Sequence, residues 1–202
     1  MEICCITNRH LARGDYWQRL EKIAASGVSS LIIREKDMEP TDYEAYAEHA
    51  LALCQAYGVT CVLHHFSSVA LNLGASHFHC SLQDLQQQPD LSMHIPYIGV
   101  SIHTLAEARE AQRLGAAYVI VGNVFPTACK PGWTPVGTAT LKDICAGVNR
   151  PVYALGGMTA ENLPHLAGLP LAGIVSMSGL MTCTDPPAYI QSLADCLQRR
   201  KS

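Results

Sequence analysis

The chain has 202 residues, of which 49% are hydrophobic and 15% are charged, and its formal net charge is −3. This composition predicts a folded chain long enough for one large core and excludes an intrinsically disordered protein. The slightly acidic balance provides no electrostatic footprint for nucleic acid, and no apolar run approaches the roughly 20 residues of a membrane span.

The nine cysteines include no Cys-x-x-Cys pair, and most lie within apolar segments. Small buried thiols of this kind predict reduced cysteines in a cytoplasmic protein, without a disulfide framework. The apolar start, residues 1–6, is too short for a signal peptide. The basic cluster at 199–201 is typical of a solvated helix end.

Short runs rich in Val, Ile, Tyr and Cys alternate with segments of helical spacing along the whole chain. These runs have the length and composition of buried strands. The predicted strands lie at about 2–6, 29–34, 59–64, 76–80, 96–101, 117–121, 151–155 and 172–177.

The clearest predicted helix covers 41–57, where apolar residues recur at i, i+3, i+4 and i+7. Thr41 is its expected N-cap and Gly58 its stop. A second helix is predicted over 104–114, with Thr104 and Glu107 as a capping box.

A last helix is predicted over 186–199, where one stripe carries Tyr189 and three aliphatic side chains. The segments 65–75 and 80–95 are too short or too polar for confident helices. We therefore expect irregular connections there.

Eight strands separated by helices in about 200 residues predict a single-domain (β/α)₈ TIM barrel over residues 1–202. The rival is an open, doubly wound sheet. That fold favours a glycine fingerprint after the first strand, and residues 7–14 contain no G-x-G-x-x-G.

A barrel of this type places its chemistry at the carboxyl ends of the strands, and phosphate often binds the loops after strands seven and eight. Those loops here contain Gly156-Gly157 and Met177-Ser178. Adjacent glycines let the backbone approach a ligand, and amides at a helix start favour an anion. The alternative is that both loops are simple turns.

Cations follow two other predicted strands. Arg34 and Lys36 alternate with Glu35 after strand two, so the two cations share a face that suits a phosphate or diphosphate. After strand six, Thr127 and Lys130 bring a hydroxyl and a point charge to a proline-rich loop. A plain strand exit and a surface loop are the alternatives.

Four histidines, at 64, 65, 77 and 79, are predicted to cluster at the ends of strands three and four. An imidazole titrates near neutrality, so His64 or His65 is a candidate general base. A transition-metal site and simple packing remain open, because the spacing matches no dedicated zinc motif.

Taken in order, these motifs resemble the thiamine phosphate synthase and thiazole tautomerase superfamily nearly end to end. The resemblance rests on Ile6-Thr7, Ile33-Arg34-Glu35-Lys36, His79 through Asp84, Gly99 through His103, Val124-Phe125-Pro126-Thr127 with Lys130, Gly156-Gly157-Met158-Thr159 and Met177-Ser178-Gly179. It implies a (β/α)₈ barrel, in agreement with the alternation of strands and helices.

For the synthase branch, the resemblance implies that a thiazole phosphate is held by the glycine pair with Met177 and Ser178. It implies that a pyrimidine diphosphate is met by Arg34, Lys36 and Lys130, with Ser101 and Thr127 lining the site. It also implies Mg²⁺ between two aspartates, one of which matches Asp84. The departing diphosphate would be stabilised electrostatically.

Three positions depart from the synthase pattern. Ile32 stands where the family has Gln, His64-His65 stand where it has Asn-Asp, and Cys129 replaces a threonine. Imidazole is a poor ligand for a hard cation that prefers oxygen. All three changes fall on the pyrimidine and metal side, which argues against ordinary synthase activity.

The loop sequences lean toward the tautomerase branch, which moves a proton on a thiazole carboxylate phosphate and needs no metal. Its characteristic histidine base corresponds to Asn123, and an amide cannot take up a proton. His64 or His65 is therefore expected to act as the base. The expected function is tautomerase-like, with a thiamine phosphate synthase or a noncatalytic thiazole phosphate-binding protein as alternatives, and a homodimer as the expected assembly.

Overall fold

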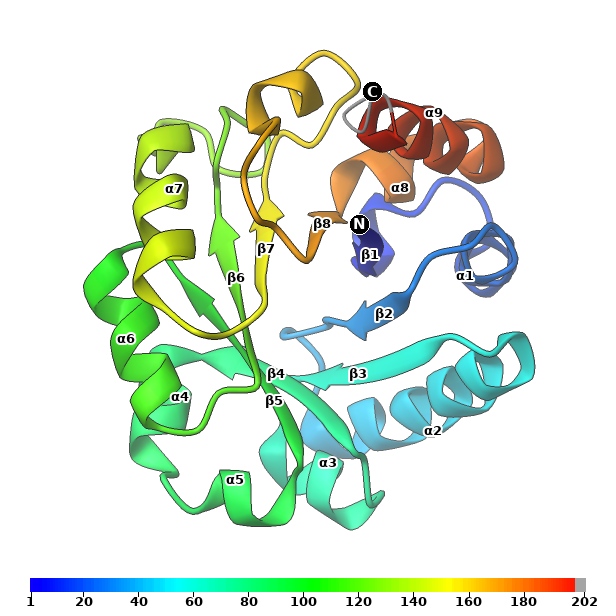
Figure 1. The fold of residues 1–202 in the computed structure, drawn as a ribbon. Helices are drawn as coiled ribbons and strands as arrows, with labels where there is room; N and C mark the ends of the chain where they lie inside the picture. The colour runs from blue at the N-terminus through cyan, green and yellow to red at the C-terminus, as the bar shows by residue number, and fades with distance from the viewer. Residues whose placement is uncertain (199–202) are drawn as a thin grey trace.

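Eight parallel strands close into a barrel in the order of the chain, and helices surround it (Figure 1). The structure, a computed structural model, describes residues 1–198. The predicted (β/α)₈ TIM barrel is confirmed, and each predicted strand agrees with the observed one to within one residue at either end. The strands are β1 Glu2–Ile6, β2 Ser30–Ile33, β3 Thr60–His64, β4 His77–Ser81, β5 Tyr97–Ile102, β6 Tyr118–Gly122, β7 Val152–Leu155 and β8 Gly173–Ser176.

The barrel closes where β1 pairs with both β2 and β8. Cys4 is opposite Ser30 on one side and Val175 on the other. Parallel neighbours need crossover connections, which here run through helices on the outside. The helical elements are η1 Arg9–Leu11, α1 Tyr16–Ala24, α2 Pro40–Tyr57, α3 Ser67–Asn72, α4 Leu82–Gln87, α5 Leu91–His94, α6 Leu105–Arg113, α7 Gly137–Gly147, η2 Leu163–Leu166, α8 Ser178–Thr182 and α9 Pro186–Gln198.

Helix α9 carries the stripe predicted for the last helix, but the predicted end at residue 199 and the basic cluster at 199–201 lie outside the described residues. Among the helices of residues 1–198, none has the length and apolar character needed to cross a membrane.

Two of the predicted helix starts differ in detail. Helix α2 begins at Pro40 rather than after Thr41, because the fixed φ of proline suits the first helical position and its missing N–H costs nothing there. In α6 the Thr104 hydroxyl accepts from the Glu107 amide, as predicted. The Glu107 carboxylate accepts instead from the amide of His103, at 2.6 Å, so the capping box is only half formed.

The expectation of irregular connections at 65–75 and 80–95 was wrong, because three short helices form there. Helix α4 has a complete capping box between Ser81 and Asp84, which satisfies amides at its first turn. Each short helix also buries an apolar residue, such as Val69 or Leu85, against the barrel. Tertiary burial thus stabilises helices too short to form alone.

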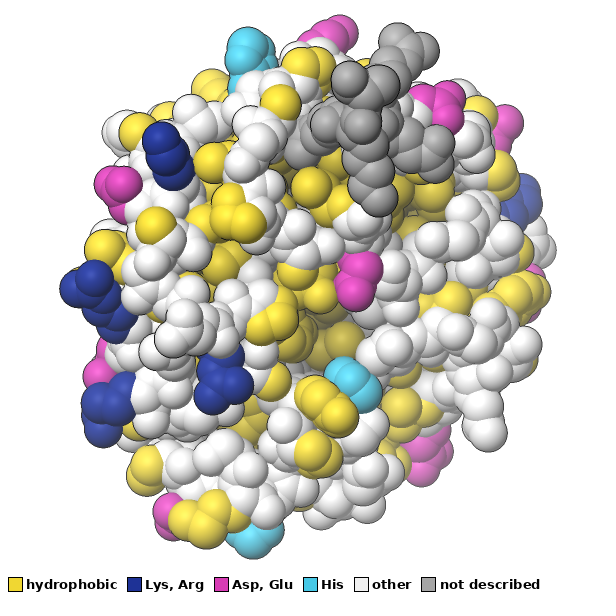
Figure 2. Space-filling model, viewed as in Figure 1, with side chains coloured by type: hydrophobic (Ala, Val, Ile, Leu, Met, Phe, Trp, Pro, Cys, Tyr) yellow, Lys and Arg dark blue, Asp and Glu magenta, His cyan; other side chains and the backbone are white. Residues whose placement is uncertain are grey.

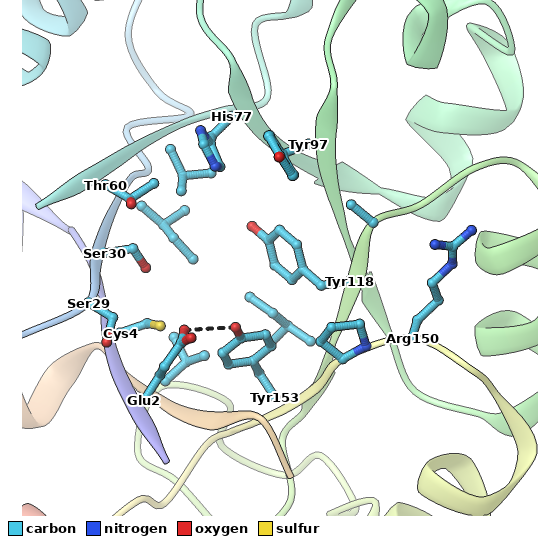
Figure 3. A pocket seen from close by; sticks show the side chains of 16 residues that line it. Glu2, Cys4, Ser29, Ser30, Thr60, His77, Tyr97, Tyr118, Arg150 and Tyr153 are labelled. Carbon is cyan, nitrogen blue, oxygen red and sulfur yellow. Dashed lines mark hydrogen bonds between the residues drawn. The ribbon is translucent and has the colours of Figure 1, made fainter.

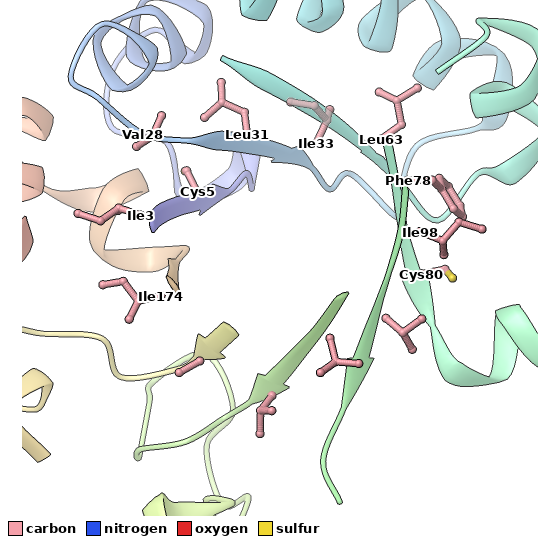
Figure 4. Packing of buried hydrophobic residues seen from close by; sticks show 14 of the residues in the cluster. Ile3, Cys5, Val28, Leu31, Ile33, Leu63, Phe78, Cys80, Ile98 and Ile174 are labelled. Carbon is pink, nitrogen blue, oxygen red and sulfur yellow. The ribbon is translucent and has the colours of Figure 1, made fainter. Parts of the chain in front are cut away.

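The hydrophobic core has two parts. The larger fills the space between the sheet and the helices, and Figure 4 shows strand residues such as Leu31, Leu63 and Ile98 within it. The smaller lies inside the barrel, and we call it the inner plug: Cys4, Ile6, Ile32, Val62, Ile120 and Val175. A cavity lies on each side of this plug, one at each mouth of the barrel.

Candidate active site at the carboxyl ends of the strands

The upper cavity, about 560 Å³ in volume, lies at the carboxyl ends of the strands. Nearly all the candidate site residues from the sequence line it, although they come from seven strands, β2 to β8, and the loops that follow them. The lining includes Arg34, Lys36, His64, His79, Ser101, Asn123, Thr127, Cys129, Lys130, Gly156, Gly157, Met177 and Ser178. His65 and Asp84 are absent from this lining.

The glycine pair after β7 is required by the closeness of the loop after β6. Gly156 and Gly157 have φ values of 94° and 67°, which few other residues adopt. A Cβ on Gly156 would lie 2.4 Å from the Cβ of Asn123, and one on Gly157 would lie 2.6 Å from the Cβ of Phe125. Asn162 fixes the turn by donating its side-chain amide to the carbonyl of Gly157 at 2.8 Å.

The loop after β8 lies against the same turn. Gly179 leaves space for Tyr189 of α9, because a Cβ there would lie 2.2 Å from the tyrosine hydroxyl. That hydroxyl donates to the carbonyl of Met158 at 3.0 Å. Tyr189 therefore joins the two loops that carry Gly157 and Ser178, and it lines the cavity itself. The sequence reading placed Tyr189 only on an apolar stripe and missed this role.

At the end of β2 the alternation of side chains separates cations from the carboxylate. Arg34 and Lys36 line the cavity, while Glu35 is 2% exposed and points away from it. Glu35 accepts from the Thr7 hydroxyl at 3.0 Å and from the guanidinium of Arg9 at 3.1 Å. Burial, together with the neighbouring Arg34, lowers the pKa of Lys36. The two cations thus form an electropositive wall that an anion would stabilise.

His64 presents an imidazole to the cavity. Its side chain is buried, and Nδ1 has no hydrogen-bond partner among the described residues. Burial, with a smaller contribution from His79, lowers the pKa of His64 well below its usual range. The backbone of His64 is fixed by the hydroxyl of Tyr43, which accepts from the His64 amide at 3.0 Å and donates to the carbonyl of Ile33 at 2.7 Å.

His79 lies beside His64, with ring centroids 5.6 Å apart, but both its nitrogens have partners. Nε2 lies 2.8 Å from the Ser101 hydroxyl and Nδ1 lies 3.3 Å from the Tyr118 hydroxyl. Burial lowers the pKa of His79 to about 3, so the ring is neutral near pH 7. A neutral imidazole donates through one nitrogen and accepts through the other, which orders this chain of three side chains.

The four predicted histidines do not form one cluster. His77 begins β4 and lines the opposite cavity, so the expectation that it accompanies His64 and His79 was wrong. The predicted bounds of this strand, 76–80, were off by only one residue. The error was to place His77, which is the first residue of β4, at the carboxyl end of the strand. His65 has a φ of 74° and is turned toward Asp84, with 3.9 Å between its Nδ1 and Oδ2 of the carboxylate.

Asp84 was the candidate magnesium ligand. Its Oδ2 accepts from the Ser81 amide at 3.2 Å, where it caps α4, and the neighbouring polar group is the imidazole of His65. Within residues 1–198 there is no group of three His, Cys, Asp or Glu side chains that could hold a metal ion. Magnesium prefers oxygen ligands, and here the imidazole of His65 stands beside the carboxylate of Asp84, so this pair does not fit the ion.

The loop after β6 places Lys130 and Thr127 on the cavity wall. A turn brings them together, because the Lys130 amide donates to the Thr127 carbonyl at 3.1 Å. The Lys130 ammonium lies 5.0 Å from the ring centroid of Trp133, which is exposed. Asn123 is buried and donates its side-chain amide to the carbonyl of Phe125 at 3.2 Å. Its amide therefore holds the loop and offers no basic nitrogen.

The family model and the curated relatives agree on one family. A family model described as thiamine monophosphate synthase matches residues 3–180. The thiamine-phosphate synthase 2 of Streptococcus pneumoniae is 30% identical over 195 residues, which cover 95% of this chain and 93% of that protein. The thiamine-phosphate synthase of Methanobrevibacter smithii is also 30% identical over 195 residues, with coverage of 96% and 93%.

Among solved structures, a thiamine phosphate pyrophosphorylase from Pyrococcus furiosus superposes with a TM-score of 0.86. It is 23% identical and the match covers 100% of this chain and 97% of that one. At this identity the superposition shows the shared barrel fold.

Proposed function

The chain belongs to the thiamine monophosphate synthase family and so to thiamine biosynthesis, and from that premise we propose that it is a thiamine-phosphate synthase. It would couple hydroxymethylpyrimidine diphosphate to a phosphorylated thiazole. The observation that carries the proposal is that a single cavity has anion-binding groups from two separate sets of loops. One set follows β7 and β8, and the other follows β2 and β6.

The first set suits the monophosphate of the thiazole. Gly157 and Ser178 belong to loops that Tyr189 holds together, and glycine lets a phosphate approach the backbone closely. The second set suits the diphosphate, because Arg34, Lys36 and Lys130 all line the cavity. Arginine can bind phosphate oxygens in pairs, and lysine supplies a point charge.

In the proposed reaction the bond between the pyrimidine methylene carbon and the diphosphate oxygen breaks, and its electron pair leaves with the diphosphate. The thiazole nitrogen then gives its lone pair to the methylene carbon and forms the new C–N bond. Cations preorganised at the leaving oxygens stabilise the negative charge that develops there. The neutral rings of His64 and His79 lie in the same cavity without adding positive charge beside the organic cation.

Magnesium has no part in this scheme. Asp84 caps a helix beside an imidazole, so the residues present do not supply the oxygen ligands that the ion prefers. Arg34, Lys36 and Lys130 would meet the diphosphate charge themselves.

The test is to incubate the protein with both substrates, with and without magnesium, and to measure thiamine phosphate by mass spectrometry. Formation of product that depends on both substrates supports the proposal. No product at enzyme concentrations comparable with the substrate would exclude it.

A second candidate, tautomerase-like proton transfer on a thiazole carboxylate phosphate, is favoured by one observation. His64 lines the cavity, and its buried Nδ1 has no hydrogen-bond partner among residues 1–198, which leaves that nitrogen free to accept a proton. Deuterium uptake from solvent into the thiazole, lost in His64→Asn, would support this function. If the protein bound thiazole phosphate tightly but catalysed neither the coupling nor the proton transfer, that result would support a noncatalytic thiazole phosphate-binding protein.

A further inference from the structure

A second cavity, about 470 Å³ in volume, lies at the amino-terminal mouth of the barrel, on the other side of the inner plug. Figure 2 views this face and shows a hollow at its centre, with acidic and histidine side chains at the edge and hydrophobic ones on the floor. In TIM barrels the interior is normally filled by layers of side chains. An open volume of ligand size at this end therefore needs a cause.

Two glycines leave this lower cavity open. A Cβ on Gly99 of β5 would lie 2.0 Å from Cζ of Tyr118, and one on Gly173 of β8 would lie 2.8 Å from Cε1 of Tyr153. Both tyrosine rings thus lie against bare backbone along the wall of the barrel. Because the rings lie along the wall, they border the central volume and leave part of it unfilled.

The wall of the lower cavity is aromatic. The rings of Tyr118 and Tyr153 meet at 72° with centroids 5.5 Å apart and form a corner. Across from them Tyr97 stacks on His77, with centroids 4.6 Å apart and planes 8° apart. Burial raises the pKa of Tyr118 and Tyr153 and lowers the pKa of His77, so these groups are neutral near pH 7.

One carboxylate faces this aromatic corner. Tyr153 donates its hydroxyl to Oε2 of Glu2 at 2.8 Å, which fixes the carboxylate at the edge of the tyrosine ring. Within the described part of the chain, the other ionised side chain of the lining is Arg150, and Figure 3 shows it beyond Tyr118, on the opposite side from Glu2. Among the described side chains of the lining, those at the corner are therefore a carboxylate and the aromatic rings.

We propose that the lower cavity is a second ligand site and that it takes a small organic cation, such as a quaternary ammonium group. Aromatic faces attract such cations, and a nearby carboxylate adds to the attraction. An anion would meet Glu2, and a bare metal ion would find no group of three ligating side chains among residues 1–198. This site is separate from the proposed function at the upper cavity and does not depend on it.

The test compares choline with 3,3-dimethyl-1-butanol, in which carbon replaces the charged nitrogen and the shape is kept. Binding to the full chain is measured by calorimetry and by amide chemical shifts, with ionic strength matched by NaCl. We expect choline to bind roughly tenfold more tightly than the alcohol. Its shifts should fall at Ser30 and Tyr97 and spare Gly157 and Ser178.

Two variants separate charge from shape. Glu2→Gln should weaken choline binding roughly tenfold and leave the alcohol unchanged, whereas Glu48→Gln on the exposed face of α2 is the matched control. Tyr153→Phe keeps the ring and frees the carboxylate, so it should weaken choline binding about threefold. Thermal unfolding shows that each variant is folded.

Equal affinity for choline and the alcohol, no change in Glu2→Gln, or shifts confined to the upper cavity would each overturn the proposal. The choline experiment measures binding at the lower cavity alone. A negative result in the synthase assay would therefore not change what the choline experiment shows.

Discussion

The hydroxyl of Tyr118 lies 3.3 Å from Nδ1 of His79, and this contact joins the two mouths of the barrel. Tyr118 lines the lower cavity, His79 lines the upper one, and Ser101 continues the chain at 2.8 Å from Nε2. The imidazole of a proposed active site is thus oriented by a residue on the other side of the inner plug.

Replacing Tyr118 with Phe should test that orientation. The ring still fills its place beside Gly99, but Nδ1 of His79 loses its partner. We expect a loss of about 0.5–1.5 kcal/mol in the free energy of unfolding. The ¹⁵N chemical shifts of His79 should move toward a mixture of tautomers. Unchanged chemical shifts would mean that the contact with Ser101 alone fixes the tautomer of the His79 ring.

Gly157→Ala should damage phosphate binding. The new Cβ would meet the Cβ of Phe125, and the φ of 67° is strained for alanine. The expected loss of stability is about 1–3 kcal/mol, with weaker binding of thiazole phosphate measured by calorimetry. The matched control is Gly58→Ala, because Gly58 has a φ of 66° but open space around it. That variant should lose stability and keep its phosphate affinity.

Lys36→Gln should weaken the binding of inorganic pyrophosphate by about 1.5–3 kcal/mol, the usual contribution of a charged hydrogen bond. Lys142→Gln, on the exposed side of α7, is the control. Because burial and Arg34 lower the pKa of Lys36, the wild-type affinity should fall with rising pH before an ordinary lysine loses its proton. Equal affinity in the two variants would remove Lys36 from the diphosphate site.

The stability of the protein should fall as the pH drops below 6.5. The pKa of His79 is lowered to about 3 in the fold, so the unfolded chain binds a proton there first. Stability from this group is present above its unfolded pKa and is lost at up to about 1.4 kcal/mol per pH unit below it. Urea unfolding between pH 7.5 and 4.5 measures the slope, and His79→Gln should make it shallower. His64 should contribute in the same direction.

Much of the barrel could be predicted because strands and loops leave local signals. The apolar runs fixed the strand bounds to within one residue, and Gly156-Gly157 marked a turn with positive φ values. The short helices α3 to α5 left weaker signals, since burial against the barrel stabilises them. Asp84 matched a family metal position by order along the chain, yet its contacts are those of a helix cap.

The lower cavity could not be predicted from local patterns. Its open volume depends on Gly99 and Gly173, and each glycine matters because a tyrosine from the neighbouring strand lies against it. Such cross-strand pairs require the register of the sheet. The same holds for His77, which precedes His79 by only two residues but lies at the start of β4 and therefore at the other mouth of the barrel.

Val175 of β8 borders both cavities, so its side chain lies between the upper and the lower cavity. A smaller residue there would enlarge both hollows together, and a larger one would shrink them together. Any substitution of Val175 that adapts one cavity to its ligand therefore also changes the volume of the other cavity.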